Sequence, residues 1–353
     1  MKKKILLVTF SDNADHQDTL FGMYENLLGE QDVYLLAIKE PKVEVKKCET
    51  TWLVDCPKRP GICKKTFDLK LLFSLIKRVR KEKFDVIYFE SLHVWNLPIM
   101  ILSSKNTHTF QVVHEVIPHE GDKQVKMVDL MNKAVCLFCD TIVLRNQMYI
   151  DEMVKRYHIS KDRIRYSELW RRYPEYTEPT YSKRVLFFGR INPYKGADNL
   201  IDLARMCPDI QFDVVGRVDA QMEEVMAELS KEKNVLINND YVSDEEMKNY
   251  FINADWIIVP YNSASQSGII IDAYKYSRPV IAFNVGAISE QVSDGESGYL
   301  IAAGDKQKFA EKLREVVAMP KSQFEEMCKD AYYYGSQKYA ASGARERFME
   351  LVK

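Results

Sequence analysis

Short apolar runs rich in Val, Ile, Leu and Phe recur along the whole chain, and segments with helical patterns separate them. Most runs are continuous rather than alternating, which is typical of strands that are covered on both faces. In chain order they are KILLVTF, VYLLAI, FDVIYFE, FQVVHE, TIVL, VLFFG, FDVVG, NVLI, DWIIVP, PVIAF and GYLIA. Repeated strand–helix–strand units predict parallel sheets with right-handed crossovers.

The alternation is interrupted once, at residues 166–183, which hold two prolines and few aliphatic side chains. A chain of 353 residues is also too long for one ordinary core. We therefore expect an α/β protein with two Rossmann-like, doubly wound domains at 1–165 and 184–335, joined by that linker. A closing helix at 336–353 could pack on either domain, including back on the first. Ligands bind beyond the carboxyl ends of parallel strands, so two facing sheets would form an interdomain cleft.

Charge and cysteine content exclude several classes of protein. Fifty Lys and Arg against 51 Asp and Glu give a net charge of −1, so no global field attracts nucleic acid. The apolar run after the N-terminal lysines covers only residues 5–10, too short for a signal sequence or a membrane span. We expect a cytoplasmic protein with free thiols, in which Cys136 and Cys139 are buried structural residues rather than a redox or zinc pair.

The motif GRINPYKG follows the run VLFFG directly and precedes a predicted helix. Gly189 allows the backbone to turn off the strand, and Arg190 and Lys195 place two cations in the loop at its carboxyl end. Two fixed cations suit a diphosphate, whose negative charge grows as it leaves. The alternative is a pair of solvated surface cations.

A second motif, VPYNSASQSGIIIDAY, places a small polar loop between a strand and a helix. Ser267 and Gly268 would offer free backbone N–H groups and the positive end of the helix dipole to a phosphate. Asp272, about one turn further on, could accept hydrogen bonds from ribose hydroxyls. An N-capped core helix alone would explain neither the glycine nor the carboxylate.

A third motif, FQVVHEVIPHEGD, gathers histidines and carboxylates after a predicted strand of the first half. His114 stands where the strand ends, with Glu115 beside it and His119 beyond a proline. Glu115 and His119 are further candidates for contact with the sugar or the acceptor. A lone histidine at a strand end is more often structural, but this density favours a site. The short spacing of the two histidines is poor for a helix-borne metal site.

Residues 58–83 carry ten basic and two acidic side chains around an apolar stripe. Such a segment could rest on an anionic membrane and present a lipid-linked acceptor. The alternative, an ordinary basic outer helix of the first domain, is favoured over it.

Taken together, the chain resembles family 4 of the retaining glycosyltransferases, which have the GT-B architecture. GRINPYKG resembles the family's G-R-x4-K-G, and DVVGRVD resembles the segment that holds its glycine after the second strand of the C-terminal domain, here Gly216. YVSDEEMKNYFINADWIIVPY and NVGAISEQVSDGESGYLI are similar to later segments of that domain. HEVIPHEGD resembles the H-D-x-x-P-H-x-G-E of one branch.

The resemblance implies a role for each matching residue. Arg190 and Lys195 would bind the donor diphosphate, Ser267 and Gly268 would give it backbone amides, and Asp272 would hold the ribose. The remaining implied contacts are the backbone of Tyr241 and Val242 to the base, and His114, Ser265 and Gln266 to the transferred sugar. The donor would be a UDP- or GDP-linked sugar, with no metal and no other cofactor.

The chain departs from the family's pattern in two places. In the usual E-x7-E pair, Asp272 matches the second glutamate, but the first falls at Ala264 or Ser265, and neither is acidic. The paired glycines common in the first strand–helix loop are replaced by TFSDNADHQD. The first departure means that a sugar contact is missing or replaced. The second means that the family pattern does not predict the acceptor.

The reaction that the resemblance implies is sugar transfer with retention to a glycan or lipid-linked acceptor, as in the biosynthesis of bacterial surface polysaccharide. A nucleotide-sugar epimerase or phosphorylase on the same fold is the alternative among enzymes. A catalytically silent nucleotide-sugar-binding protein is the alternative outside them. A dehydrogenase is disfavoured, because no G-x-G-x-x-G follows the first strand of either half.

Overall fold

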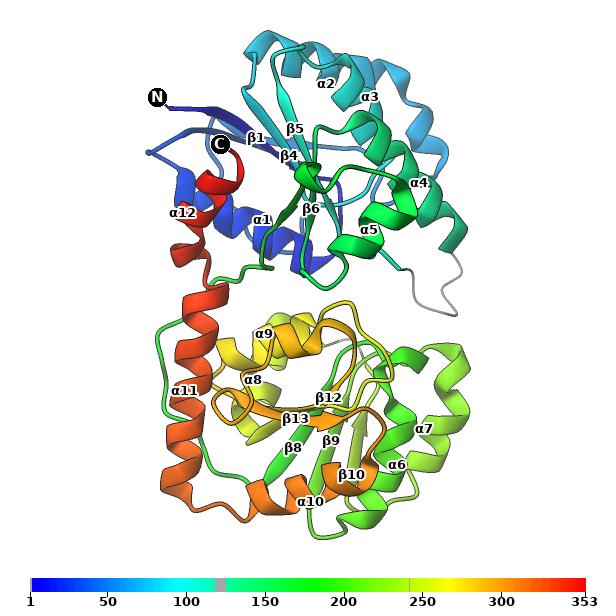
Figure 1. Ribbon diagram of the computed structural model, residues 1–353, viewed down its shortest axis with the longest axis vertical. Helices are drawn as coiled ribbons and strands as arrows, with labels where there is room; N and C mark the ends of the chain where they lie inside the picture. The colour runs from blue at the N-terminus through cyan, green and yellow to red at the C-terminus, as the bar shows by residue number, and fades with distance from the viewer. Residues whose placement is uncertain (1, 118–124, 241) are drawn as a thin grey trace. The chain divides into compact units, whose positions relative to one another are not determined.

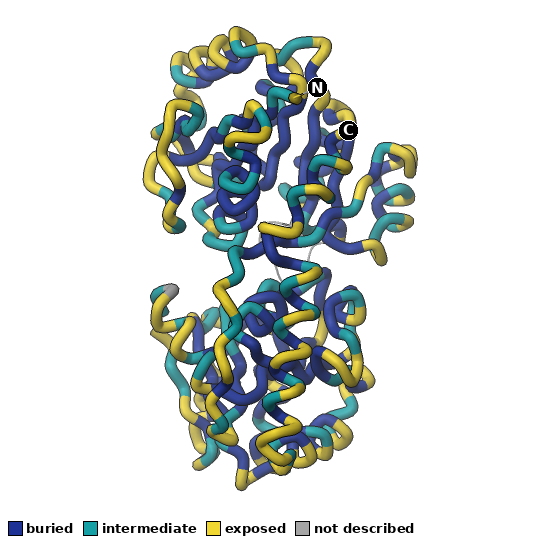
Figure 2. The backbone as a smooth tube through the Cα atoms, turned by 90° about the vertical axis from the view of Figure 1, so that its left-hand side faces the viewer, coloured by how far each residue is buried: buried dark blue, intermediate teal, exposed yellow. Residues whose placement is uncertain are grey.

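The structure, a computed structural model, describes residues 2–117, 125–240 and 242–353, and the chain forms two compact units (Figure 1). The first unit contains the described residues up to Arg172 together with Tyr339–Lys353, and the second contains Tyr173–Lys338. In each unit the buried residues lie in the interior and the exposed residues lie on the outside (Figure 2).

The first unit is built on a parallel sheet of seven strands in the order β3-β2-β1-β4-β5-β6-β7. Their bounds are β1 Lys4–Thr9, β2 Asp32–Ile38, β3 Thr51–Val54, β4 Val86–Phe89, β5 His108–Val113, β6 Thr141–Leu144 and β7 Ile164–Tyr166. The central strands are buried on both faces, as their continuous apolar sequences predict.

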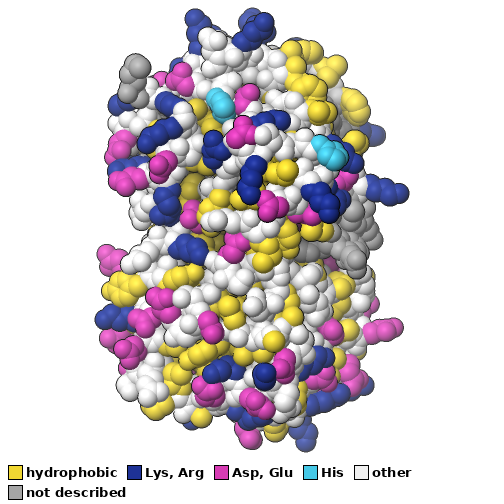
Figure 3. Space-filling view, viewed as in Figure 1, with side chains coloured by type: hydrophobic (Ala, Val, Ile, Leu, Met, Phe, Trp, Pro, Cys, Tyr) yellow, Lys and Arg dark blue, Asp and Glu magenta, His cyan; other side chains and the backbone are white. Residues whose placement is uncertain are grey.

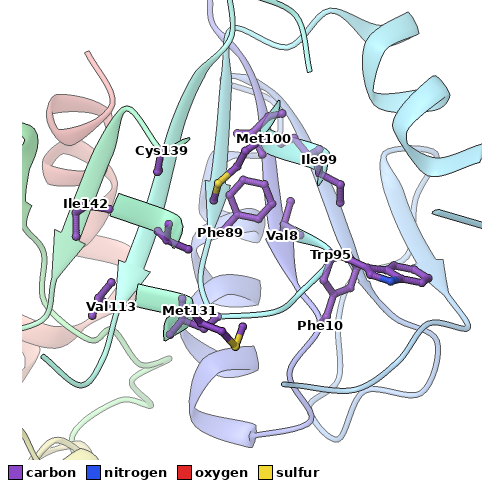
Figure 4. Close-up of a cluster of buried hydrophobic side chains, with 14 of the residues drawn as sticks. Val8, Phe10, Phe89, Trp95, Ile99, Met100, Val113, Met131, Cys139 and Ile142 are labelled. Atoms are coloured by element: carbon purple, nitrogen blue, oxygen red, sulfur yellow. The ribbon is translucent and has the colours of Figure 1, made fainter. Parts of the chain in front are cut away.

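Helices cover both faces of this sheet. One core lies under α2 (Leu69–Glu82), α3 (Asn96–Leu102), α4 (Val125–Phe138) and α5 (Ile150–Tyr157), and Figure 4 shows part of it, with Phe89 among the buried side chains. The other core lies under α1 (Ala14–Leu27) and α12 (Ala341–Leu351). Short 3-10 turns at Lys64–Phe67 and Lys161–Arg163 complete the unit.

The second unit is built on a parallel sheet of six strands in the order β10-β9-β8-β11-β12-β13. The strands are β8 Arg184–Phe188, β9 Gln211–Val215, β10 Val235–Asn238, β11 Trp256–Val259, β12 Val280–Asn284 and β13 Gly298–Ala302. The helices are α6 Ala197–Met206, α7 Glu223–Leu229, α8 Asp244–Asn253, α9 Gly268–Lys275, α10 Lys306–Val317 and α11 Lys321–Tyr339, with 3-10 turns η3 Pro193–Lys195, η4 Ala220–Met222 and η5 Gly286–Glu290.

The two units confirm the predicted α/β class of two doubly wound parallel sheets. All eleven runs identified in the sequence are strands, but β3 and β7 were not among them. Both missed strands lie at the edges of the first sheet, and both are short, so neither shows a long apolar run.

The boundaries differ from those expected at 165 and 183. Tyr166 is the last residue of β7, and the chain stays with the first unit up to Arg172. Arg171 is buried there and donates to Asp15 of α1. The range expected for the closing helix, 336–353, holds the end of α11 and the whole of α12. α12 packs on α1, so the expected possibility of packing back on the first domain is confirmed.

The helical pattern at residues 69–82 is confirmed as α2, but its apolar stripe is part of the core. Leu72, Ile76 and Val79 are buried against the sheet, whereas Leu69 and Phe73 are exposed. The stripe as a whole therefore cannot rest on lipid, since most of it is already covered by the protein.

The thiols of Cys136 and Cys139 are buried at the end of α4 and just before β6. Burial raises the pKa of each to about 12, so neither is a thiolate at neutral pH. Among the described residues, no helix has both the length and the apolar character needed to cross a membrane.

The C-terminal helix should contribute strongly to the first unit. Phe348 is fully buried, and its ring lies edge-on to Tyr88 at 5.2 Å and to Trp170 at 6.0 Å between ring centroids. We expect Phe348→Ala to lower the free energy of unfolding of this unit by about 3–5 kcal/mol in urea titrations, because a large cavity remains. The exposed neighbour Glu350 supplies the control, as Glu350→Ala should change it by less than about 0.5 kcal/mol. Equal values for the two variants would contradict a core role for α12.

Candidate functional site

The carboxyl ends of β8 and β9 meet through two glycines. Gly189 and Gly216 directly follow these strands with φ of +106° and +141°, a region that side chains rarely occupy. A Cβ on Gly216 would lie 2.2 Å from the carbonyl oxygen of Gly189. The two backbones therefore touch, and the predicted need for glycine at both positions has a direct steric cause.

Lys195 places its ammonium group directly over Gly189. A Cβ on Gly189 would lie 2.6 Å from Lys195 Nζ and 3.4 Å from the side chain of Ile269, in the first turn of α9. Lys195 is buried, and its Nζ lies 5.6 Å from the centre of the Tyr261 ring. The cation, the glycine backbone and the start of α9 thus meet at one point, where any side chain on residue 189 would fill the space.

Arg190 has a different environment from Lys195. Its side chain is 69% exposed, and its Nε donates to Asp219 Oδ1 at 2.9 Å. Asp219 lies in the loop after β9, so the guanidinium group is held at the same edge of the sheet as Lys195. The two predicted cations are therefore one buried group and one exposed, ion-paired group.

The start of α9 corrects one prediction about backbone amides. The N–H of Ser267 is not free, because it donates to Gln291 Oε1 at 2.6 Å while Gln291 Nε2 donates back to the Ser267 carbonyl at 2.9 Å. Ser267 is the N-cap and Gly268 is the first residue of the helix, where the N–H groups have no acceptor within the helix. Asp272 is buried one turn later.

Two asparagines join the GRINPYKG loop to the loop after β11. Asn199 Nδ2 donates to the Pro260 carbonyl at 2.9 Å and to Asn262 Oδ1 at 3.0 Å, and Asn262 Nδ2 donates to the Pro193 carbonyl at 3.1 Å. Gly196 has φ +68°, and a Cβ there would lie 1.9 Å from the Pro260 carbonyl oxygen. The two loops that carry Lys195 and α9 are consequently held as one rigid piece.

The other residues predicted for the donor lie around this piece. Ser265 is buried and Gln266 is half-buried in the loop before α9, and Ala264, the alternative position of the absent glutamate, is also buried. Val242 follows β10 at the same edge of the sheet and is half-buried. Tyr241 lies outside the described residues.

In the first unit, four polar side chains follow the carboxyl ends of neighbouring strands. Glu90 follows β4, His114 follows β5, Arg145 follows β6, and His16 lies in the first turn of α1 after β1. The sequence analysis identified His114 and missed the other three. The signal was present, because FDVIYFE ends on Glu90 and a charged Arg145 directly follows TIVL.

These four side chains form a cluster in which His16, Glu90 and Arg145 are buried and His114 is half-buried. Arg145 Nη2 donates to both carboxylate oxygens of Glu90 at 2.5 Å, and both side chains have 0% exposure. The rings of His16 and His114 stack with 4.3 Å between centroids. His114 Nε2 lies 2.7 Å from the Glu90 carbonyl oxygen, and His16 Nδ1 lies 2.9 Å from Ser11 Oγ.

The cluster keeps both histidines neutral. Burial lowers the pKa of His114 to about 3, with a further contribution from the charge of Arg145, and burial with the neighbouring His114 lowers the pKa of His16 well below its ordinary value. A carbonyl oxygen can only accept, so His114 Nε2 carries the proton and Nδ1 is the unprotonated nitrogen. His114 can therefore accept a hydrogen bond through Nδ1.

The rest of the third motif is only partly described. Glu115 is half-buried, and its carbonyl oxygen accepts a hydrogen bond from Asn132 Nδ2 at 3.2 Å. His119 lies outside the described residues.

The neutral histidines predict acid sensitivity of the first unit. A group whose pKa is lower in the folded state stabilises that state above its ordinary pKa and loses this contribution as the pH falls. From pH 7 to pH 5, His114 alone should cost roughly 2 kcal/mol of unfolding free energy. Urea titrations at both pH values should show a smaller loss in His114→Gln than in the unchanged chain, whereas His158→Gln, at an exposed position, should behave as the unchanged chain. An equal pH dependence in His114→Gln would contradict a neutral His114.

Comparisons with known proteins show which sequences and folds this chain is similar to. The sequence profile of the family described as Glycosyl transferases group 1 matches residues 172–338. An uncharacterized 41.2 kDa protein in the cps region of Klebsiella pneumoniae is 23% identical over 80% of this chain and 82% of its own length. The D-inositol 3-phosphate glycosyltransferase of Mycolicibacterium smegmatis is 29% identical over 39% of this chain, but only a third (33%) of that enzyme is matched.

Solved structures share the fold of the whole chain. HepE of Anabaena, in complex with UDP, superposes with a TM-score of 0.71 over 100% of this chain and 99% of its own, at 14% identity. Its likeness extends over both parallel-sheet units. Residues 172–338 therefore match the family of glycosyl transferases group 1, and the chain has the GT-B fold of two Rossmann-like domains.

Proposed function

We propose that the protein transfers a sugar, with retention of configuration, from a nucleotide-sugar donor to a glycan or lipid-linked acceptor. The observation that supports it best is the position of Lys195 Nζ, over a glycine that clears space beside the first turn of α9. A buried cation and the free N–H groups at the start of a helix both favour a phosphate group. HepE, which shares the fold, holds UDP in its solved complex.

The chemistry follows from the charge of the leaving group. The bond from the sugar C1 to the diphosphate breaks with its electron pair going to the diphosphate oxygen, and the acceptor oxygen bonds to C1 on the same face. The acceptor proton passes to an oxygen of the departing diphosphate. Lys195 and Arg190 would neutralise the charge that develops, so that no metal ion is required. The carboxylate pair of glycoside hydrolases would then be unnecessary.

The nucleoside would lie beside the diphosphate along the same edge of the sheet. Asp272 would accept hydrogen bonds from the ribose, and the backbone after β10, including Val242, would contact the base. Ser265 and Gln266 would reach hydroxyls of the sugar, in place of the absent glutamate. Because the Ser267 N–H is engaged by Gln291, Gly268 and the residues after it would supply the backbone amides.

On the acceptor side we propose a contact between His114 and the transferred sugar. Its unprotonated Nδ1 would accept a hydrogen bond from a sugar hydroxyl. The matched Klebsiella protein from a cps region supports a place in the biosynthesis of surface polysaccharide. We also propose a cytoplasmic location with peripheral contact to an anionic membrane through residues 58–83.

Loss of either cation should reduce turnover. We expect Arg190→Ala to lower kcat about 10²–10³-fold, the usual effect of removing one preorganised charge donor, and Lys195→Met to lower it at least as much. Arg205→Ala is the matched control, since Arg205 is a half-exposed arginine of the same unit that pairs with Glu228 and Glu232 at the end of α6. Transfer from a radiolabelled donor measures all three, with and without a chelator.

The same assay separates the alternative functions. Epimerised sugar nucleotide formed without acceptor would replace the transferase with an epimerase, and sugar phosphate formed with inorganic phosphate would replace it with a phosphorylase. Binding of the sugar nucleotide without turnover, across a broad panel of acceptors, would indicate a catalytically silent binding protein. Near-normal turnover of Arg190→Ala would remove Arg190 from the mechanism.

The donor's base and the ribose contact can be tested by thermal shift. We expect stabilisation by UDP or GDP and by the corresponding sugar nucleotides, with a clear preference for one base. Asp272→Asn should weaken that nucleotide about 10–100-fold, because a hydrogen bond to a charged group contributes roughly 1.5–3 kcal/mol. Unchanged affinity would place the ribose elsewhere.

A further inference from the structure

Exposed large apolar side chains are distributed unequally over the chain. Among the described residues, all but Leu236 and Tyr333 lie in the first unit. Four of them fall within one short segment at the start of α2 and just before it: Ile62 at 60%, Phe67 at 79%, Leu69 at 55% and Phe73 at 58% exposure. We call this set the apolar edge. Figure 3 shows hydrophobic side chains gathered on the part of this unit that α2 and α3 form.

The apolar edge is held rigidly on the carboxyl ends of β1 and β4. The N–H of Arg59 donates to the Phe10 carbonyl at 2.8 Å, and the N–H of Val94 donates to the Pro60 carbonyl at 3.1 Å. Trp95 Nε1 donates to the Thr66 carbonyl at 3.1 Å. The exposed apolar side chains therefore belong to a segment that backbone hydrogen bonds hold against the rest of the unit.

Basic side chains surround the apolar edge. Lys64 and Lys70 are exposed within the same segment, and Lys58 and Lys65 are exposed while paired with Asp12 and Asp55. Asp68 caps α2 through Leu71 and is the acidic residue inside the segment. Exposed phenyl and branched side chains next to several lysines are the combination that binds the interface of an anionic bilayer.

We propose that the apolar edge docks the first unit on an anionic lipid bilayer. Phe67 and Phe73 would enter the boundary between headgroups and acyl chains, while the lysines would contact anionic headgroups. Charge favours lipid over a second copy of the chain, because a symmetric contact would bring the same lysines together. The stripe buried under α2 takes no part, so the docking residues differ from those suggested by the helical pattern.

Docking at this edge has a consequence for the acceptor. The strand ends that anchor the segment belong to the same edge of the sheet as Glu90 and His114. The bilayer would therefore lie beside the carboxyl edge of the first sheet, where a lipid-linked acceptor is delivered. This consequence rests on the proposed transferase function, whereas the docking itself does not.

Flotation of the full chain with lipid vesicles tests the docking. We expect the chain to float with vesicles of phosphatidylcholine and about 30% phosphatidylglycerol, to stay unbound with phosphatidylcholine alone, and to dissociate at high salt. Phe67→Ser with Phe73→Ser should weaken binding at least about tenfold, and Lys64→Glu should weaken it at least about fivefold. Leu137→Ser is the matched control, because Leu137 is 77% exposed on α4 but lies before β6, at the amino edge of the sheet.

Cys63 offers an independent measure of insertion. It is exposed and lies between Ile62 and Lys64, so a polarity-sensitive fluorophore on its sulfur should shift to shorter wavelength when anionic vesicles are added. Cys48, the other exposed thiol, is replaced by serine in this experiment. The same shift should be absent in the variant with both phenylalanines replaced.

Three outcomes would overturn the proposal. These are no flotation with anionic vesicles, equal flotation of the phenylalanine variant and the unchanged chain, or a change of oligomeric state in that variant, which would assign the edge to a second copy. Transfer to a soluble acceptor is measured on the same variants. If transfer persists while flotation is lost, both proposals stand, whereas flotation without any transfer would remove the proposed function alone.

Discussion

The carboxyl ends of parallel strands lie along one edge of a sheet, and the groups of both candidate sites lie in the loops and helix starts beyond such ends. In the second unit Gly189, Gly216 and Lys195 meet there, and in the first unit His114 and Glu90 do. The central strands are covered on both faces and are mostly apolar, so their ends offer more room for polar side chains. The topology of the sheet therefore sets the location of the candidate site, whatever residues occupy the loops there.

In the second unit this edge is shaped by backbone contact. The glycines at 189, 196 and 216 each bring a backbone or a charged group closer than a Cβ would permit. That closeness lets a buried ammonium group stand over the main chain beside a helix start. The Gln291 side chain occupies the N–H of Ser267, which moves the available amides one position into α9.

In the first unit the same edge is shaped by a buried ion pair. Removing Glu90 would leave the guanidinium group of Arg145 without its partner in a site of low dielectric, a change that usually costs about 3–5 kcal/mol. The backbone carbonyl oxygen of the same Glu90 lies 2.7 Å from His114 Nε2. Burial keeps the stacked histidines neutral, so this half of the protein presents hydrogen-bonding nitrogens rather than positive charge.

The sequence by itself determined the fold class, eleven strands, α2, and the residues after β8 and β11, because apolar runs and glycine-rich loops are local signals. It missed β3 and β7, which are short edge strands without such runs. Only the tertiary structure decided that Glu90, Arg145 and His16 surround His114, that Gln291 engages Ser267, and that Phe67 and Phe73 stay exposed while Leu72 and Ile76 are buried. Each of these depends on contacts between segments that are far apart in the chain. A pattern of neighbouring residues predicts a local helix or strand, but it does not specify which distant side chains that element will contact.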